Sequence, residues 1–232
     1  MGSRWVIGDI HGCIATFQAM LEKEIGLQPD DTLFLLGDLI DRGPDSKAVI
    51  DYALRLQEQA YDVRSIKGNH EFMLLDAIRS ERQYILWMRN AGMTTLRDFG
   101  IDVERYPGPE GVRRIPARYL DFFQQMPYYI ESEGFFLVHA GLNPECLHPL
   151  DDTDTMIWTR KEAYHSDFLK GRKLIHGHTP LHREEILRQL SDRDTQIYNL
   201  DGGCLYCDFP GLGNLVAMNL DSGESRMVRN LE

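Results

Sequence analysis

Residues of the kinds that bind metal ions or move protons recur at the ends of five short apolar runs. The runs stop at Gly8-Asp9-Ile10-His11-Gly12, Gly37-Asp38, Gly68-Asn69-His70-Glu71, His139-Ala140-Gly141 and His176-Gly177-His178. A single Asp after a strand is more often a helix cap, and a single His is more often an ordinary core or surface residue. Five such endings favour one shared site, because the carboxyl ends of strands in α/β sheets are where sites assemble.

The donor atoms of this set are carboxylate and amide oxygens and imidazole nitrogens, with no thiolate. This mixture suits manganese, iron or zinc better than calcium or a structural Cys-rich zinc. More than four ligands imply two ions, and we expect Asp38 to bridge them because it follows a strand expected near the centre of the sheet. Two ions about 3.5–4 Å apart can generate hydroxide at neutral pH and hold the oxygens of an in-line phosphoryl displacement.

Two neighbouring features favour phosphate esters over other substrates of metal-assisted hydrolysis. Arg42 follows Asp41 just after the bridging residue, and its planar guanidinium can hold two phosphate oxygens at once. His70 stands next to Asn69, which places a general acid beside a ligand. Without these neighbours, Arg42 would be interpreted as half of a surface ion pair worth ~0–1 kcal/mol.

Hydrophobic periodicity indicates the elements that position these residues. Buried strands are expected at residues 5–7, 33–36, 63–66, 135–138 and 173–175, and helices after the first three of them, the second capped by Asp45 or Ser46. Late runs at residues 196–200, 215–219 and 226–228 indicate closing antiparallel strands. The fold class is therefore α/β.

The segment from about residue 79 to 126 has a different pattern. Gly and Pro separate its helical pieces, and Tyr119, Phe122, Phe123 and Met126 recur at helical spacing. We predict a helical insertion that could act as a lid. It would lie within a single domain spanning residues 1–232, a length at which one α/β domain is common.

Charge and composition exclude several classes of function. The chain of 232 residues has 25 Lys and Arg against 36 Asp and Glu, a formal net charge of -11, without a basic cluster to bind nucleic acid. No apolar stretch approaches the ~20 residues of a membrane span, so we expect a soluble, cytoplasmic protein with no membrane partner. The oligomeric state cannot be read from these features.

Four cysteines are too few for a disulfide scaffold in a chain of this length. Cys204 and Cys207 form one CxxC pair, whereas a zinc ribbon would need a second pair at similar spacing. We therefore expect two reduced, buried side chains near a strand.

Together these motifs resemble the phosphoprotein phosphatase (PPP) family of metallophosphoesterases. The matching runs, in the family order, are Gly8-Asp9-Ile10-His11-Gly12, Gly37-Asp38-Leu39-Ile40-Asp41-Arg42-Gly43, Gly68-Asn69-His70-Glu71, His139-Ala140-Gly141-Leu142 and Gly177-His178-Thr179. The short chain and Pro144 resemble the bacterial and phage branch of Ser/Thr protein phosphatases. The resemblance implies a calcineurin-like sandwich of two mixed β-sheets flanked by helices.

The resemblance also implies a role for each residue of the site. The metal ligands would be Asp9 and His11 for the first ion, Asp38 as the bridge, and Asn69, His139 and His178 for the second. His70, oriented by Asp41, would be the general acid, and Arg42, Arg160 and Asn69 would hold the phosphate. His176 is a neighbour that the family pattern passes over in favour of His178.

The expected cofactors are two divalent metal ions, with manganese first and iron, zinc or nickel as alternatives. One departure from the family pattern is Lys67, where many relatives carry arginine. A lysine offers a point charge in place of a bidentate fork, which weakens the expected grip on the substrate.

Three functions are compatible with this site. The leading hypothesis is a metal-dependent phosphomonoesterase acting as a protein Ser/Thr phosphatase, with a phosphorylated protein or a small phosphoester as substrate. The alternative is a symmetrical dinucleoside tetraphosphate hydrolase, in which Tyr84, Trp87 or Tyr106 of the insertion would stack on a base. A non-catalytic phosphate-binding scaffold is the third, and the complete ligand set argues against it.

Overall fold

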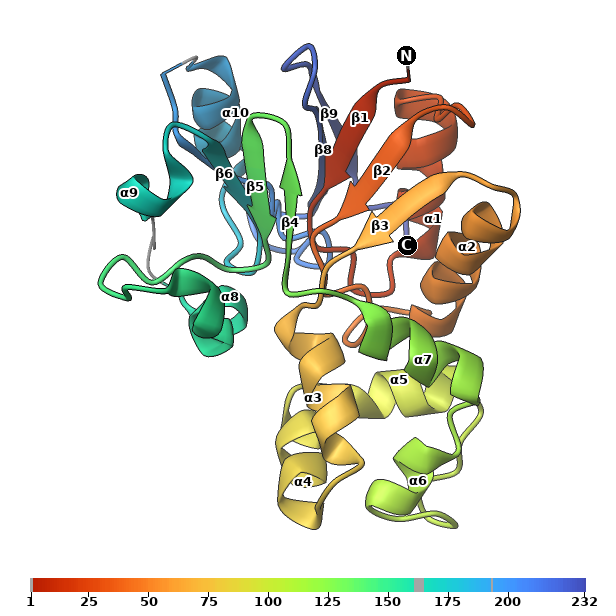
Figure 1. Ribbon diagram of the computed structural model, residues 1–232. Helices are drawn as coiled ribbons and strands as arrows, with labels where there is room; N and C mark the ends of the chain where they lie inside the picture. Colours follow the sequence, from red (N-terminus) through yellow and green to blue (C-terminus); the bar gives the residue numbers. More distant parts are fainter. Residues whose placement is uncertain (1, 161–164, 193) are drawn as a thin grey trace.

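Two β-sheets form the centre of the molecule in the computed structural model, which describes residues 2–160, 165–192 and 194–232 (Figure 1). The five-stranded sheet has the order β3-β2-β1-β8-β9, and the four-stranded sheet has the order β4-β5-β6-β7. The strands are β1 (Arg4–Ile7), β2 (Thr32–Leu35), β3 (Asp62–Ser65), β4 (Tyr129–Ser132), β5 (Phe135–Val138), β6 (Lys173–His176), β7 (Ile197–Asn199), β8 (Asn214–Asn219) and β9 (Ser225–Arg229).

Both sheets are mixed, as expected for this fold class. Strands β1, β2 and β3 run parallel, and β8 pairs antiparallel with β1 and with β9. In the second sheet β5, β6 and β7 run parallel, and β4 is antiparallel to β5. One prediction was wrong: the run at residues 196–200 forms β7 parallel to β6, not a closing antiparallel strand. Strand β4 was not predicted, because its alternation is weak and it is only partly buried.

The alternation of side chains along the strands creates two cores. In β1 and β2, Val6 and Phe34 point between the two sheets, where they pack with Leu137 and Ile175 of the second sheet. Their neighbours point to the opposite face and pack on the helices, as Ile7 does. The strands are therefore buried on both faces, which explains why they read as continuous apolar runs.

Helices cover the outer faces of both sheets (Figure 1). Helix α2 (Ser46–Glu58) begins where the sequence predicts. The Asp45 carboxylate caps it by accepting a hydrogen bond from the Ala48 backbone N–H at 2.8 Å. No helix within the described ranges is long and apolar enough to cross a membrane. The helices are α1 (Ile14–Ala19), the π-helix η1 (Met20–Glu24), α2 (Ser46–Glu58), α3 (Asn69–Ala77), α4 (Glu81–Arg89), α5 (Gly92–Asp98), α6 (Pro109–Arg113), α7 (Ala117–Gln125), the 3₁₀-helix η2 (Pro149–Asp151), α8 (Thr153–Trp158), α9 (Ser166–Leu169) and α10 (Arg183–Ser191).

Helices α4 to α7 occupy residues 81–125, the segment expected to be a helical insertion. They lie with α3 below the strand ends in Figure 1. Trp87 of α4 and Tyr119 of α7 are almost completely buried, and both belong to the same apolar cluster as β1 and α2. The helical segment is thus packed onto the main core. One domain over residues 1–232 stays a prediction.

Candidate active site

The loops that follow β1, β2, β3, β5 and β6 bring the predicted polar residues into one cluster. Ligand atoms of His11, Asp38 and His70 lie within 4.8 Å of one another, and so do those of Asp38, His139 and His178. Asp38 belongs to both groups. All five residues are buried. The geometry therefore suits two neighbouring ions that share one carboxylate.

Asp38 reaches both groups with different oxygens. Its Oδ2 lies 3.6 Å from Nε2 of His11, and its Oδ1 lies 3.4 Å from Nε2 of His139. Burial raises the pKa of this carboxyl, but the positive charges of His139 and His70 outweigh that effect and hold the pKa well below its usual value. Asp38 is thus an anion that faces imidazoles on two sides.

The second group is arranged around His139. The Nδ1 of His139 donates to the Leu36 carbonyl at 2.8 Å, which turns Nε2 toward the cluster. That Nε2 lies 3.1 Å from Oδ1 of Asn69 and 3.1 Å from Nδ1 of His178. Oxygen and nitrogen ligand atoms of Asn69, His139 and His178 thus lie close together, as the sequence predicts. His176 ends β6 and lies outside both groups.

The first group differs from the expected ligand set. His11 is oriented by its Nδ1, which donates to the Ile40 carbonyl at 2.9 Å. The carboxylate of Asp9 accepts from the backbone N–H of His178, with both oxygens at 3.2 Å. His70, not Asp9, completes the group of three that can hold an ion. The roles of Asp9 as a ligand and His70 as an acid stay predictions.

The residues present fit divalent ions on two further grounds. The Nε2 atoms of His70 and His178 are buried and have no hydrogen-bond partner among the described residues. Burial lowers the pKa of His11 and of His178 to about 3, so both imidazoles are neutral at physiological pH, which is the form that binds a metal ion. Burial opposes protonation of His139 as well, but Asp38 and Asp9 raise its pKa to about 10, so this imidazole holds a proton that a metal ion would displace.

Backbone strain is concentrated in the same loops. Left-handed conformations cost roughly 1–3 kcal/mol for residues with side chains and gather at functional sites. Five of the eight non-glycine residues with positive φ angles within the described ranges belong to the predicted site. They are His11 (φ 47°), Asp38 (49°), Asp41 (68°), Arg42 (70°) and His178 (73°).

Two motif glycines allow the backbones of these loops to approach each other. A Cβ added at Gly68 would lie 2.2 Å from Oδ1 of Asp38, and one added at Gly177 would lie 2.1 Å from Oδ1 of Asp9. Any side chain at either position would displace a carboxylate of the cluster. The glycines before Asn69 and His178 are therefore part of the site's geometry.

Two buried carboxylates to which the sequence analysis gives no role, Glu71 and Asp201, also lie near the cluster. The carboxylate of Glu71 accepts the backbone N–H groups of Asp38 and Gly68 at 3.0 Å and of Leu39 at 2.8 Å. Asp201 is buried, and burial raises its pKa to about 6. The signal for Glu71 was its place three residues after the N-cap of a helix, where a glutamate often binds backbone N–H groups. For Asp201 the only signal was its position in a turn.

Of the three residues expected to bind phosphate, Asn69 lies within the cluster, and Arg42 and Arg160 lie at its rim. Nη1 of Arg42 donates to Nε2 of His11 at 2.9 Å and lies 3.5 Å from the Tyr206 hydroxyl. Arg160 is exposed, and its charge is one of the effects that, after burial, lower the pKa of His178. Lys67 is nine-tenths buried, and its ammonium lies 5.1 Å from the Tyr128 ring. The lysine that stands where many relatives carry arginine is therefore packed beside the site.

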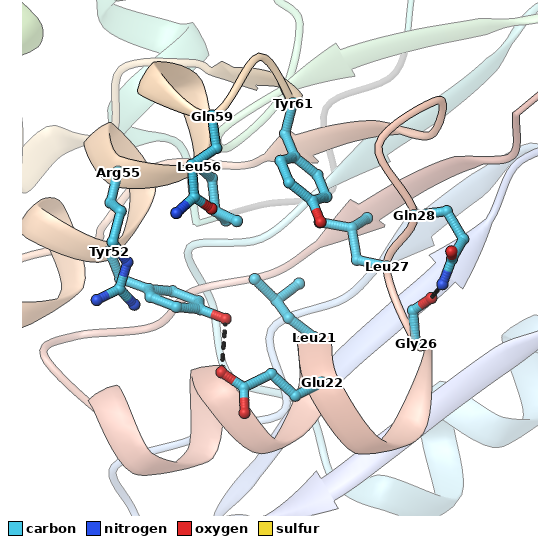
Figure 2. A pocket seen from close by; sticks show the side chains of 10 residues that line it. All are labelled: Leu21, Glu22, Gly26, Leu27, Gln28, Tyr52, Arg55, Leu56, Gln59 and Tyr61. Atoms are coloured by element: carbon cyan, nitrogen blue, oxygen red, sulfur yellow. Dashed lines mark hydrogen bonds between the residues drawn. The ribbon is translucent and has the colours of Figure 1, made fainter.

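A separate cavity of about 560 Å³ lies between η1 and α2 (Figure 2). Leu21, Tyr52 and Tyr61 line it, and it includes none of the cluster residues. The cysteines also lie outside the cluster. Cys204 is buried as expected, but Cys207 is exposed, so the expected burial of Cys207 was wrong.

Comparison with known proteins decides the family. The family model for calcineurin-like phosphoesterases matches residues 3–202. The chain belongs to this family. Serine/threonine-protein phosphatase 1 of Salmonella typhimurium is 31% identical over 193 residues, which cover 77% of this chain and 79% of that protein. The resemblance to PPP metallophosphoesterases is thus confirmed, and the chain is a hydrolase.

Relatives of a second kind match a shorter part of this calcineurin-like phosphoesterase. The symmetrical bis(5'-nucleosyl)-tetraphosphatase of Buchnera aphidicola subsp. Acyrthosiphon pisum is 40% identical over 143 residues, covering 62% of this chain and 46% of that protein. The chain thus spans less than half of that relative's length. Among solved structures, a provisionally assigned diadenosine tetraphosphatase has a TM-score of 0.68 at 23% identity, covering 100% of this chain and 95% of the other.

A protein serine/threonine phosphatase from Saccharomyces cerevisiae has a TM-score of 0.65 at 16% identity, covering 100% of this chain and 81% of the other. At such identities the two solved structures support the fold alone. The family requires divalent metal ions, and the two His and Asp groups agree with this requirement.

Proposed function

We propose that this phosphoesterase is a metal-dependent phosphomonoesterase of the protein Ser/Thr phosphatase type. The observation that carries the proposal is the pair of ligand groups that share Asp38, one of which includes His70. When bound, two ions would supply a hydroxide nucleophile at neutral pH and neutralise charge on the phosphoryl oxygens. We propose Asp9, His11, Asp38, Asn69, His139 and His178 as the ligands, with manganese as the expected metal.

His70 is proposed as the general acid because of its two different nitrogen environments. Its Nδ1 lies 2.7 Å from Oδ2 of Asp41, and both side chains are fully buried. Its Nε2 has no hydrogen-bond partner in the described structure and lies 3.9 Å from Oδ2 of Asp38. The Asp41 contact occupies Nδ1, so Nε2 is the atom that can deliver a proton to the leaving oxygen.

Arg42 and Arg160 are proposed to bind the phosphate, together with the Asn69 amide. The Nε2 lone pair of His11 accepts from Arg42 and cannot serve a guanidinium and a metal ion at once. Metal binding at His11 would therefore release Nη1 of Arg42 for the substrate. The guanidinium of Arg42 would then be free to bind two phosphate oxygens at the rim. Its charge would offset the overall charge of -11, which repels an anionic substrate.

Two findings favour a phosphoprotein over a dinucleotide as the substrate. Serine/threonine-protein phosphatase 1 matches over 79% of its own length, whereas these nucleotide hydrolase relatives match over 44–46% of theirs. The ring of Trp87 is fully buried, so it cannot stack on a base. Tyr106 lies 4.0 Å from the Arg114 guanidinium and is partly occupied by that contact.

The symmetrical dinucleoside tetraphosphate hydrolase remains the second proposal, supported by the 40% identity over 143 residues that the nucleotide hydrolase from Buchnera shows. A panel of phosphoserine and phosphothreonine peptides should be compared with a dinucleoside tetraphosphate, each with the manganese-loaded protein. We expect a higher kcat/KM for the peptides. Selective turnover of the dinucleotide would replace the first proposal by the second, and turnover of neither would favour a phosphate-binding scaffold.

A further inference from the structure

Side chains from three helices contact the Asp41 carboxylate. Nδ1 of His70, at the start of α3, lies 2.7 Å from Oδ2. Nε1 of Trp87 in α4 donates to the same oxygen at 2.7 Å. The hydroxyl of Thr95 in α5 donates to the other oxygen, Oδ1, at 2.5 Å. Each of the four side chains involved is fully or almost fully buried.

These contacts fix the plane of the carboxylate. A carboxylate with one partner can rotate about its terminal torsion, which has a broad energy profile. Donors on both oxygens remove that freedom. The backbone N–H of Asp41 is held as well, by the hydroxyls of Ser46 at 3.0 Å and Thr95 at 3.1 Å. Asp41 has a φ of 68°, so these contacts also stabilise a strained backbone.

We propose that Trp87 and Thr95 are positioning residues for the general acid His70, acting through Asp41. The inference rests on the proposed phosphoesterase function and extends it to helices α4 and α5. These helices lie below the strand ends (Figure 1), and their two donors are 46 and 54 residues away from Asp41 in the sequence. The helical segment is thus part of the machinery that orients the acid.

The inference predicts a dependence on the leaving group. In the hydrolysis, the water oxygen forms a bond to phosphorus, and the bond to the leaving oxygen breaks with its electron pair. That oxygen takes the proton from Nε2 of His70, and the proton lost by the water restores His70 over the cycle. A nitrophenolate leaves without much help, whereas a phenolate or an alkoxide needs the proton. A misdirected His70 should therefore slow only the poor leaving groups.

Two variants remove one donor each and retain most of the packing. Trp87→Phe keeps an aromatic ring but lacks the N–H, and Thr95→Val keeps the branched shape but lacks the hydroxyl. With manganese added, kcat should be measured on 4-nitrophenyl phosphate and on phenyl phosphate. We expect each variant to lower kcat on phenyl phosphate by roughly 10-fold, the range for loss of an outer-shell partner, and to change kcat on 4-nitrophenyl phosphate by less than about twofold.

Tyr119→Phe is the matched control. Its hydroxyl donates to Asp51 at 2.6 Å, its ring is buried in α7, and within the described residues it makes no hydrogen bond to Asp41. It should leave the ratio of the two kcat values unchanged, even if thermal stability falls. Should Trp87→Phe and Thr95→Val slow both substrates equally, or neither, the positioning role is wrong. If the wild-type protein hydrolyses neither ester, it is the proposed function that fails.

Discussion

The cluster of candidate ligands and the cavity between η1 and α2 are built in opposite ways. At the cluster, side-chain-bearing residues such as Asp38 and His178 adopt left-handed backbone, and buried imidazole nitrogens lack partners. At the cavity the chain turns at Gly26, where positive φ carries little cost, and the Tyr52 hydroxyl donates to Glu22 at 2.9 Å (Figure 2).

The comparison teaches that volume does not mark the functional site in this molecule. The cavity is roomy, but the Tyr52 hydroxyl is paired with Glu22, the Gln28 amide donates to the Gly26 carbonyl, and the Arg55 guanidinium lies 4.7 Å from the Tyr52 ring. The cluster is tight, strained and rich in unused ligand atoms. Strain and unmet polar capacity persist only where the surrounding structure enforces them, which makes them the better indicators of function.

Asp38→Asn should have the largest effect, because Asp38 is the only residue common to both ligand groups. We expect metal affinity to fall by more than the ~10²-fold that loss of an outer-shell partner costs, and turnover to fall further than in any variant below. Elemental analysis after dialysis would report the metals per chain. Retention of two ions at the wild-type affinity would refute the bridging role.

His70→Asn should separate chemistry from metal binding. If His70 is the acid, turnover of phenyl phosphate should fall by ~10²-fold or more while two ions remain bound. If His70 is a ligand in place of Asp9, one ion should be lost. Isothermal titration with manganese distinguishes these outcomes, with Asp9→Asn as the matched variant that should show the reverse pattern.

Arg42→Lys should have a smaller effect confined to substrate binding. A lysine keeps the charge but loses the bidentate fork, and a hydrogen bond to a charged group contributes about 1.5–3 kcal/mol. That range corresponds to roughly a 10- to 100-fold loss of kcat/KM, expressed mainly in KM. An unchanged affinity for inorganic phosphate in the metal-loaded variant would argue that Arg42 does not contact the substrate.

Tyr52→Phe should have the smallest effect and completes the comparison. It removes the hydroxyl that donates to Glu22 and keeps the ring in the apolar core. We expect a loss of stability of about 1 kcal/mol, measured by urea denaturation, with unchanged kcat and KM. A large loss of turnover would show that the cavity and the cluster are coupled.

Most of the site could be predicted because its signals are local. Each of the site-bearing strands was recognisable from its apolar residues, and each carries its polar residues within a few positions of its end, as β2 does with Asp38. Because the carboxyl ends of strands in α/β sheets converge, these loops could be predicted to lie close together. The glycines before Asn69 and His178 were likewise visible as motif positions.

What escaped prediction depends on packing between distant segments. The sequence indicated Trp87 only as a ring that could stack on a base. Its hydrogen bond to Asp41 joins residues 46 positions apart, so no local pattern predicts it. The parallel direction of β7 is set by its neighbour β6, and neither strand's own pattern encodes it. The position of His70 within the first ligand group depends on how α3 meets β2, which a motif does not specify.

The carboxylate of Glu71 accepts three backbone amides from the loops after β2 and β3. These three amide protons can exchange with deuterated solvent only after their hydrogen bonds to the Glu71 carboxylate break. Displacement of the carboxylate exposes all three at once. The amides of Asp38, Leu39 and Gly68 should therefore give one common free energy of opening, as a single cooperative unit. The two loops would then open and close together, so Asp38 and the Gly68-Asn69 turn would move as one unit.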